Sequence, residues 1–200
     1  MNPWTAHGAS DKRTVLQETE REAKKVHLFL TGKVQVGKST IIRKLIGEYP
    51  GTIGGFRTVK GPQKPDGGSD IFMMDVSQWD ETDYDPSQVV ARRIGMTQYE
   101  GYPEVFDRIG TALLTAAKGK DLIIMDELGF MEQEAYQFQK AVLDCLERNV
   151  PVLGVVKPAS TEFLEQIHKH YRTTVLEVTE GNRGQVLEEV RQRILHPQYV

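Results

Sequence analysis

The residues best suited to chemistry in this sequence form a glycine-rich run near its start. The pattern G-x-x-x-x-G-K-[ST] is matched at every fixed position, by Gly32, Gly37, Lys38 and Ser39. Such a run binds phosphates, because its glycines let backbone N–H groups point inward and the following helix adds its positive end. We expect the phosphate-binding segment to comprise Gly32, Lys33, Val34, Gln35, Val36, Gly37, Lys38, Ser39 and Thr40.

Two side chains of this run have the chemistry to meet a triphosphate and its metal ion. The Lys38 ammonium is expected to reach the β- and γ-phosphates, and the Ser39 hydroxyl to coordinate Mg²⁺. The sequence therefore predicts a protein that binds a nucleoside triphosphate together with Mg²⁺.

A pair of acids follows a second apolar run, Leu122 to Met125. Asp126 is expected to hold Mg²⁺ or one of its waters, and Glu127 to orient or deprotonate a water that attacks the γ-phosphate. The alternative is that the two acids only cap the next helix. Asp126 to Gly129 also fits the D-x-x-G pattern of GTPases, but residues 155–160 hold no Asn-Lys-x-Asp guanine reader.

The elements that must position these residues alternate in type along the chain. Residues 26–30 read as a buried strand before the glycine run, and residues 39–46 as a helix after it. Two short strand candidates, 53–58 and 71–76, flank the turn sequence at Pro65 to Gly68 and predict a β-hairpin insertion. The acidic stretch 80–86 reads as a solvated loop.

The second half of the chain repeats helix and strand patterns in turn. Residues 103–117 predict one helix with Val105, Ile109, Ala112, Leu113 and Ala116 on its apolar face. The predicted elements after strand 122–125 are helix 132–148, strand 152–156, helix 160–170, strand 173–178 and helix 182–195. This order predicts an α/β fold with a mostly parallel sheet flanked by helices.

Composition limits the domain organisation and the partners. Residues 1–25 read as a polar N-terminal extension, and residues 26–197 as a single domain. The net charge of −3 gives no basic field for nucleic acid or an anionic membrane. The apolar runs are too short to span a bilayer, and residues 1–25 are unlike a signal peptide, so a cytoplasmic protein is expected. The sequence identifies no protein partner.

With these motifs in place, residues 26–195 resemble the THEP-type nucleoside-triphosphatases, P-loop proteins sometimes described as nucleotide kinases. The resemblance lies in Gly54 to Thr58, in Asp126 to Glu132 and in Asn182-Arg183. It implies slow, Mg²⁺-dependent hydrolysis of ATP, GTP and other triphosphates with low base selectivity, on a RecA-like fold. It also makes Asn182 and Arg183 candidates for contacts with base or ribose.

The chain departs from the family's pattern after Thr58, where an acidic residue and an arginine are usual and Val59 and Lys60 stand instead. Arg57, Lys60, Arg92 and Arg93 are candidates for the cation that this departure removes, although a place on the solvated surface is the simpler interpretation of all four. Two other functions remain open at this stage. One is a nucleotide or small-molecule kinase, and the other is a nucleotide-dependent switch or accessory ATPase.

Overall fold

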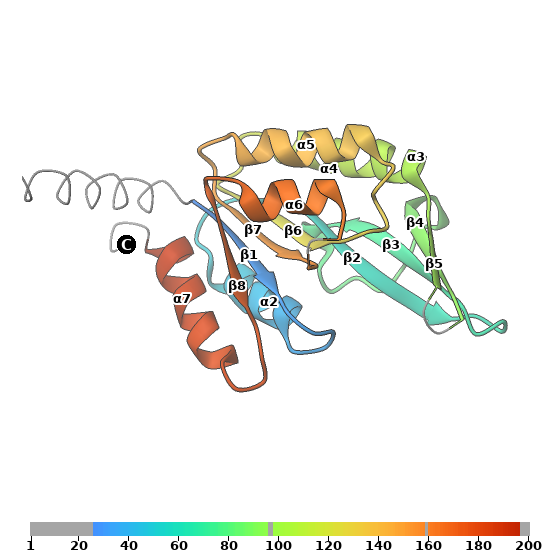
Figure 1. Cartoon of the computed structure of the whole chain (residues 1–200), viewed down its shortest axis with the longest axis horizontal. Coiled ribbons are helices and arrows are strands. Elements are labelled where there is room, and N and C mark those ends of the chain that lie inside the picture. The colour runs from blue at the N-terminus through green and yellow to red at the C-terminus, as the bar shows by residue number, and fades with distance from the viewer. Residues whose placement is uncertain (1–25, 96–97, 159, 197–200) are drawn as a thin grey trace, which may run out of the picture.

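The protein folds around one mixed sheet with helices on both faces, as Figure 1 shows. The computed structural model describes residues 26–95, 98–158 and 160–196. Within those residues the sheet has eight strands in the order β5-β4-β3-β2-β6-β7-β1-β8. The strands are β1 (His27–Thr31), β2 (Ile53–Gln63), β3 (Ser69–Asp75), β4 (Val89–Ile94), β5 (Gln98–Gly101), β6 (Leu122–Leu128), β7 (Val152–Val156) and β8 (Thr173–Glu177).

One half of the sheet is parallel and consists of the neighbouring strands β2, β6, β7, β1 and β8. β1 lies between β7 and β8, with Leu28 opposite Leu153 and Thr174. β6 lies between β2 and β7. The strands β1, β6 and β7 are apolar and almost wholly buried, as covering of both faces requires. β7 therefore separates the strand before the glycine loop from the strand that carries the acid pair, and the expected RecA-like α/β sheet is confirmed.

The remaining strands form an antiparallel wing. β2 runs on past the parallel half and turns back as β3, with Gly67 N donating to Lys64 O in the turn. β4 pairs with β3, and β5 pairs with β4. In Figure 1 this hairpin projects beyond the helices at the right. The predicted hairpin insertion is present, whereas β4 and β5 had no counterpart in the sequence prediction.

Helices cover the two faces of the parallel half-sheet. The helices and helical turns are α2 (Lys38–Glu48), η1 (Val76–Gln78), η2 (Pro86–Gln88), α3 (Pro103–Val105), η3 (Phe106–Gly110), α4 (Thr111–Ala116), α5 (Tyr136–Leu146), α6 (Glu162–Lys169) and α7 (Arg183–Leu195). Helices α4, α5 and α6 pack on one face, and α2 and α7 pack on the other. Each face thus has its own apolar core, and the central strands contribute to both.

One sequence prediction about a helix is wrong in detail. Residues 103–117 do not form one α-helix, because a π-helical turn, η3, separates α3 from α4. The wider turn changes which residues of this segment face the core. Phe106, Leu114 and Ala117 are buried, whereas Ala112 and Ala116, predicted on the apolar face, are exposed.

Candidate active site

The glycine run joins the carboxyl end of β1 to the first turn of α2. Gly32 has a φ of 131°, and an ideal Cβ there would lie 2.3 Å from the carbonyl oxygen of Val178. Gly37 is the N-cap of α2 with a φ of 103°. Val36 is buried in the core under α2 and α7. Both glycines are therefore required by the backbone, and the loop is fixed to the core through Val36.

The Lys38 side chain folds back over the glycine loop. The Lys38 ammonium donates hydrogen bonds to the carbonyl oxygens of Gly32, at 2.9 Å, and Lys33, at 2.7 Å. Its nitrogen therefore sits across the mouth of the loop, although most of the side chain is buried. Ser39 and Thr40 begin the exposed side of α2.

The acid pair at the end of β6 meets this loop. The Ser39 hydroxyl donates to Oδ1 of Asp126 at 3.3 Å. Asp126 is 5% exposed, and this burial raises its pKa to about 7, with the neighbouring Glu127 charge acting in the same direction. The hydrogen bond from Ser39 and the charge of Lys38 oppose that rise. The structure thus brings together Lys38, Ser39 and Asp126 as the sequence predicted.

Glu127 has contacts that the sequence did not predict. Its backbone N–H donates to the Thr58 hydroxyl on β2 at 3.3 Å. Its Oε1 forms an ion pair with the Lys157 ammonium at 3.0 Å. Lys157 directly follows the apolar run of β7, and residues in this place lie at the carboxyl edge of a parallel sheet, which is the signal by which the sequence could have identified it.

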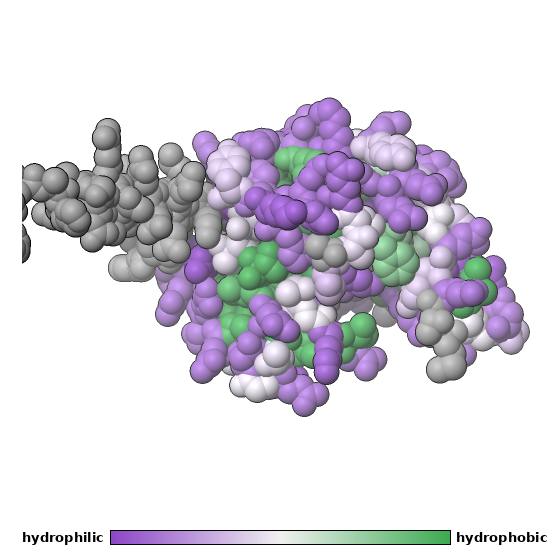
Figure 2. All heavy atoms as spheres, in the orientation of Figure 1, coloured by the Kyte–Doolittle hydropathy of each residue, from purple (hydrophilic) through white to green (hydrophobic). Residues whose placement is uncertain are grey.

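These groups line a cleft between the glycine loop and the wing. Its volume is about 560 Å³, and the outline of the molecule in Figure 2 is indented between the surface over α2 and the surface over the hairpin. The glycine loop and α2 contribute one part of the lining, and Asp126 and Glu127 at the end of β6 contribute another. The side toward the wing is lined by Thr58, Lys60, Ile71, Tyr99 and Met131. The cleft therefore extends well beyond the phosphate loop.

The oxygen groups in the cleft suit a hard divalent cation. A hydroxyl and a carboxylate, from Ser39 and Asp126, lie within hydrogen-bonding distance of each other at the loop. A carboxylate that burial leaves hard to ionise gains most from a neighbouring cation. In the described part of the chain, the cleft included, no group of three or more His, Cys, Asp or Glu side chains is placed to hold a metal.

Asn182 and Arg183, the candidates for base or ribose contacts, differ in their relation to the phosphate loop. Arg183 is exposed, and its Cδ would lie 3.1 Å from a Cβ on Gly37, so its side chain rests on the phosphate loop. Asn182 instead holds its own turn, since its amide donates to Glu177 O and its carbonyl accepts from Thr179 N. Asn182 precedes α7 without a side-chain capping bond. A nucleotide contact through either residue stays a prediction.

Three of the four candidate cations are engaged away from the cleft. Arg57 is buried, donates to the carbonyl oxygens of Gln78 and Glu81, and lies over the Trp79 ring. Arg92 pairs with Asp66 in the hairpin turn. Arg93 bonds to Ser69 and Gly67. Of the four, Lys60 is the one that lines the cleft.

Comparison with known proteins gives consistent matches over most of the described residues. A family model described as NTPase matches residues 27–191. The nucleoside-triphosphatase THEP1 of Methanosarcina acetivorans is 31% identical over 175 residues, which cover 85% of this chain and 97% of that protein. THEP1 of Thermotoga maritima is 31% identical over 169 residues, which cover 82% and 92% of the two chains. The matched region includes every element that lines the cleft.

Solved structures agree with the fold. The crystal structure of THEP1 from Aquifex aeolicus superposes with a TM-score of 0.66 at 18% identity, covering 84% of this chain and 98% of that one. The solution structure of a human cancer-related nucleoside triphosphatase gives a TM-score of 0.58 at 24% identity, covering 82% and 94%. At these identities the likeness concerns the fold alone.

Proposed function

This chain belongs to the NTPase family, and from that membership we propose that it hydrolyses nucleoside triphosphates to diphosphates and phosphate. The observation that carries the proposal is the convergence of the glycine loop, Asp126 and Glu127 on one cleft. The proposed substrates are ATP, GTP and other nucleoside triphosphates. The relatives named above carry the same activity in their names.

The glycine loop is proposed to bind the phosphates. Backbone N–H groups of residues 32–39 and the amino end of α2 provide donors and positive potential. The Lys38 ammonium, held over the loop by the carbonyl oxygens of Gly32 and Lys33, is proposed to exchange those partners for β- and γ-phosphate oxygens. Phosphate binding thus needs little movement of the backbone.

Glu127 is proposed to position the attacking water. Its carboxylate is 29% exposed in the cleft, one residue beyond the buried Asp126. Phosphoryl transfer passes through a loose transition state, so alignment of the water matters more than a strong base. The fixing of the Glu127 backbone by Thr58 supports such an alignment role.

Ser39 and Asp126 are proposed to hold Mg²⁺, directly or through a water. The bound ion would neutralise charge on the β- and γ-phosphates. Oxygen ligands of this kind suit Mg²⁺, which keeps several of its waters when bound by few protein groups.

Low base selectivity is proposed because the side chains near the loop on the α7 side offer few base-reading groups. Arg183 rests on the loop, and its guanidinium is proposed to stack on or bond to base or ribose without choosing among bases. The Asn182 amide is used in its own turn. We also propose that the protein acts in the cytoplasm on free nucleotides, with no nucleic-acid or membrane partner, in line with its net charge of −3. No helix among the described residues is long and apolar enough to cross a membrane.

The test is phosphate release from ATP, GTP, CTP and UTP, with and without Mg²⁺. Glu127→Gln is expected to bind triphosphate but lose about 10²–10⁴-fold in kcat. Lys38→Ala is expected to abolish triphosphate binding. The matched control is Glu134→Gln, an exposed acid with no place in the cleft.

Three results would contradict this proposal. Full turnover by Glu127→Gln would remove the water-positioning role. Diphosphate formation only with a nucleoside monophosphate or another acceptor would identify a kinase. If no triphosphate gives phosphate release until a protein partner is added, the protein is a nucleotide-dependent switch.

A further inference from the structure

A triphosphatase needs positive charge where the γ-phosphoryl group is transferred, and this cleft offers few sources of it. In the described part of the chain, the cations that line the cleft are Lys38, Lys60 and Lys157. Lys38 belongs to the phosphate loop itself. Lys60 is exposed and lies on β2, toward the wing. Lys157 is the cation in contact with Glu127.

The backbone of Lys157 is fixed from two sides. Its N–H donates to Leu128 O of β6 at 2.9 Å. Its carbonyl oxygen accepts a hydrogen bond from Nε2 of His168, on α6, at 2.9 Å. The residue therefore has a defined place at the carboxyl edge of the sheet, between the strand of the acid pair and the strand of the phosphate loop.

The side chain of Lys157 is also guided along its length. A Cβ on Gly129 would lie 3.1 Å from Cδ of Lys157, so the aliphatic stem crosses this glycine closely. The ammonium lies 5.3 Å from the centroid of the Phe130 ring, as in a cation–π contact. The ammonium ends 3.0 Å from Oε1 of Glu127, and the side chain as a whole is 30% exposed. The charge is thus aimed into the cleft rather than at solvent.

A chain of contacts connects this charge to the phosphate loop. Ser39 contacts Asp126, Glu127 follows Asp126, and Lys157 contacts Glu127. Two carboxylates beside a triphosphate repel its negatively charged phosphate oxygens. A nearby cation offsets that repulsion. A cation at the transferred phosphoryl group also stabilises the charge that spreads over its oxygens in the transition state.

We propose that Lys157 is a catalytic residue, which supplies from within the chain the positive charge at the γ-phosphate. Its ion pair holds the Glu127 carboxylate on the side of the attacking water, and its ammonium contacts the transferring phosphoryl group. This inference rests on the proposed triphosphatase function. It assigns to one lysine, directly after the end of β7, the task that the sequence left among Arg57, Lys60, Arg92 and Arg93.

The experiment compares Lys157→Met, which keeps the stem over Gly129 and Phe130, with Lys157→Arg, which keeps the charge. Lys169→Met, which removes an exposed lysine on α6, is the matched control. We measure kcat and KM for ATP with Mg²⁺, thermal unfolding, and the affinities for ADP with and without aluminium fluoride. Aluminium fluoride with ADP mimics the phosphoryl group in transfer.

Lys157→Met is expected to lower kcat by about 10²–10³-fold, as removal of one transition-state donor does, with KM changed less than about threefold. It is expected to bind ADP normally but to lose the tightening that aluminium fluoride gives the wild type. Lys157→Arg is expected to recover most of the activity, and Lys169→Met to behave as wild type. All variants are expected to unfold at the wild-type temperature.

Several outcomes overturn this assignment. If Lys157→Met keeps kcat within about threefold of wild type, or keeps the tightening by aluminium fluoride, Lys157 does not contact the transferring group. If ADP affinity and thermal stability fall together with kcat, its role is structural. If wild type and Lys157→Met hydrolyse ATP equally well, only this inference is wrong, and the proposed function stands. A wild type that hydrolyses no triphosphate defeats the proposed function and this inference with it.

Discussion

At the scale of single residues, a buried carboxyl group behind the cleft is the least expected feature. Glu132 is 1% exposed, and its Oε1 accepts a hydrogen bond from the N–H of Gly129. Within the described part of the chain its Oε2 has no hydrogen-bond partner. Burial raises the pKa of Glu132 to about 7, although the Gly129 hydrogen bond and the Lys157 charge oppose the rise. The residue anchors the turn that follows Glu127.

This shift predicts a dependence of stability on pH that Glu132→Gln removes. A carboxyl with a higher pKa in the folded than in the unfolded state binds its proton more tightly when folded. Its contribution is full below pH 4.5 and is lost as pH rises to about 7. Glu132→Gln, which keeps the acceptor for Gly129, should therefore gain up to about 3 kcal/mol relative to wild type between pH 5 and pH 8.

The measurement for Glu132 is urea unfolding of both proteins at several pH values. The informative quantity is the change in their stability difference with pH, because the buried amide has its own constant cost. Glu134→Gln, at an exposed neighbouring position, serves as control and should show no such change. A stability difference that stays constant from pH 5 to pH 8 would refute the assignment.

The site residues that the sequence predicted are those that belong to a local motif or end an apolar strand. Gly32, Gly37, Lys38 and Ser39 lie in a fixed local pattern, and Asp126 ends an apolar strand, so their meeting at one sheet edge was foreseeable. The contact of Lys157 with Glu127 joins a residue of β6 to the residue that follows β7. Such a contact depends on strand order, which the sequence left open.

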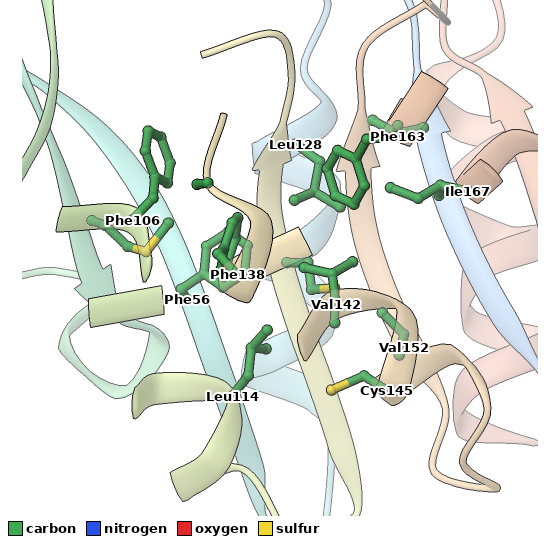
Figure 3. Close-up of a cluster of buried hydrophobic side chains, with 14 of the residues drawn as sticks. Phe56, Phe106, Leu114, Leu128, Phe138, Val142, Cys145, Val152, Phe163 and Ile167 are labelled. Atoms are coloured by element: carbon green, nitrogen blue, oxygen red, sulfur yellow. The ribbon is translucent and has the colours of Figure 1, made fainter. Parts of the chain in front are cut away.

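At the scale of elements, an aromatic cluster joins the helices of one face to the sheet. The Phe138 ring on α5 lies 5.4 Å from that of Phe56 on β2 and 5.6 Å from that of Phe106 in η3. Figure 3 shows these rings side by side. A Cβ on Gly110 would lie 2.3 Å from the Phe138 ring, so the glycine leaves the space that this ring fills.

Phe138→Ala is expected to destabilise the protein by about 3–5 kcal/mol, because it leaves a cavity where three elements meet. Tyr136→Ala, on the same helix but with its side chain in solvent, should change stability by less than about 0.5 kcal/mol. Chemical denaturation of both variants gives the comparison. Equal effects of the two substitutions would mean that this cluster does not hold α5 on the sheet.

The elements that sequence did not predict are those whose form depends on neighbours. β5 is a four-residue edge strand with mostly exposed side chains, and among the described strands its partner is β4 alone. The π-helical turn keeps Phe106 and Gly110 beside Phe138, a tertiary requirement that local periodicity does not contain. By contrast, β7, β8, α6 and α7 follow regular patterns and lie within a few residues of their predicted bounds.

At the scale of the whole molecule, we propose that residues 26–197 form the working unit. The family match begins at residue 27, where β1 also begins. The predicted extension 1–25 lies outside the described residues. Removal of residues 1–25 is expected to leave the melting temperature within about 2 °C of the full chain and the rate of ATP hydrolysis unchanged.

The check for this boundary is calorimetry and phosphate release on the shortened and full-length proteins. A second truncation that also removes β1 should fail to fold, since β1 pairs with both β7 and β8. A marked loss of activity on removal of residues 1–25 alone would give that segment a part in the site and refute the proposed boundary.

The position of β1 in the sheet also has a consequence for biosynthesis. Among the described strands, the one that leads into the phosphate loop is made first, but its partners β7 and β8 begin only at Val152 and Thr173. At about 5–20 residues per second, the nascent chain waits on the order of ten seconds for them. Truncated translation products that end before β7 would carry the complete loop motif yet lack the two strands that pair with β1. The glycine loop is thus synthesised early but can bind phosphates only after β7 and β8 have been made and have paired with β1.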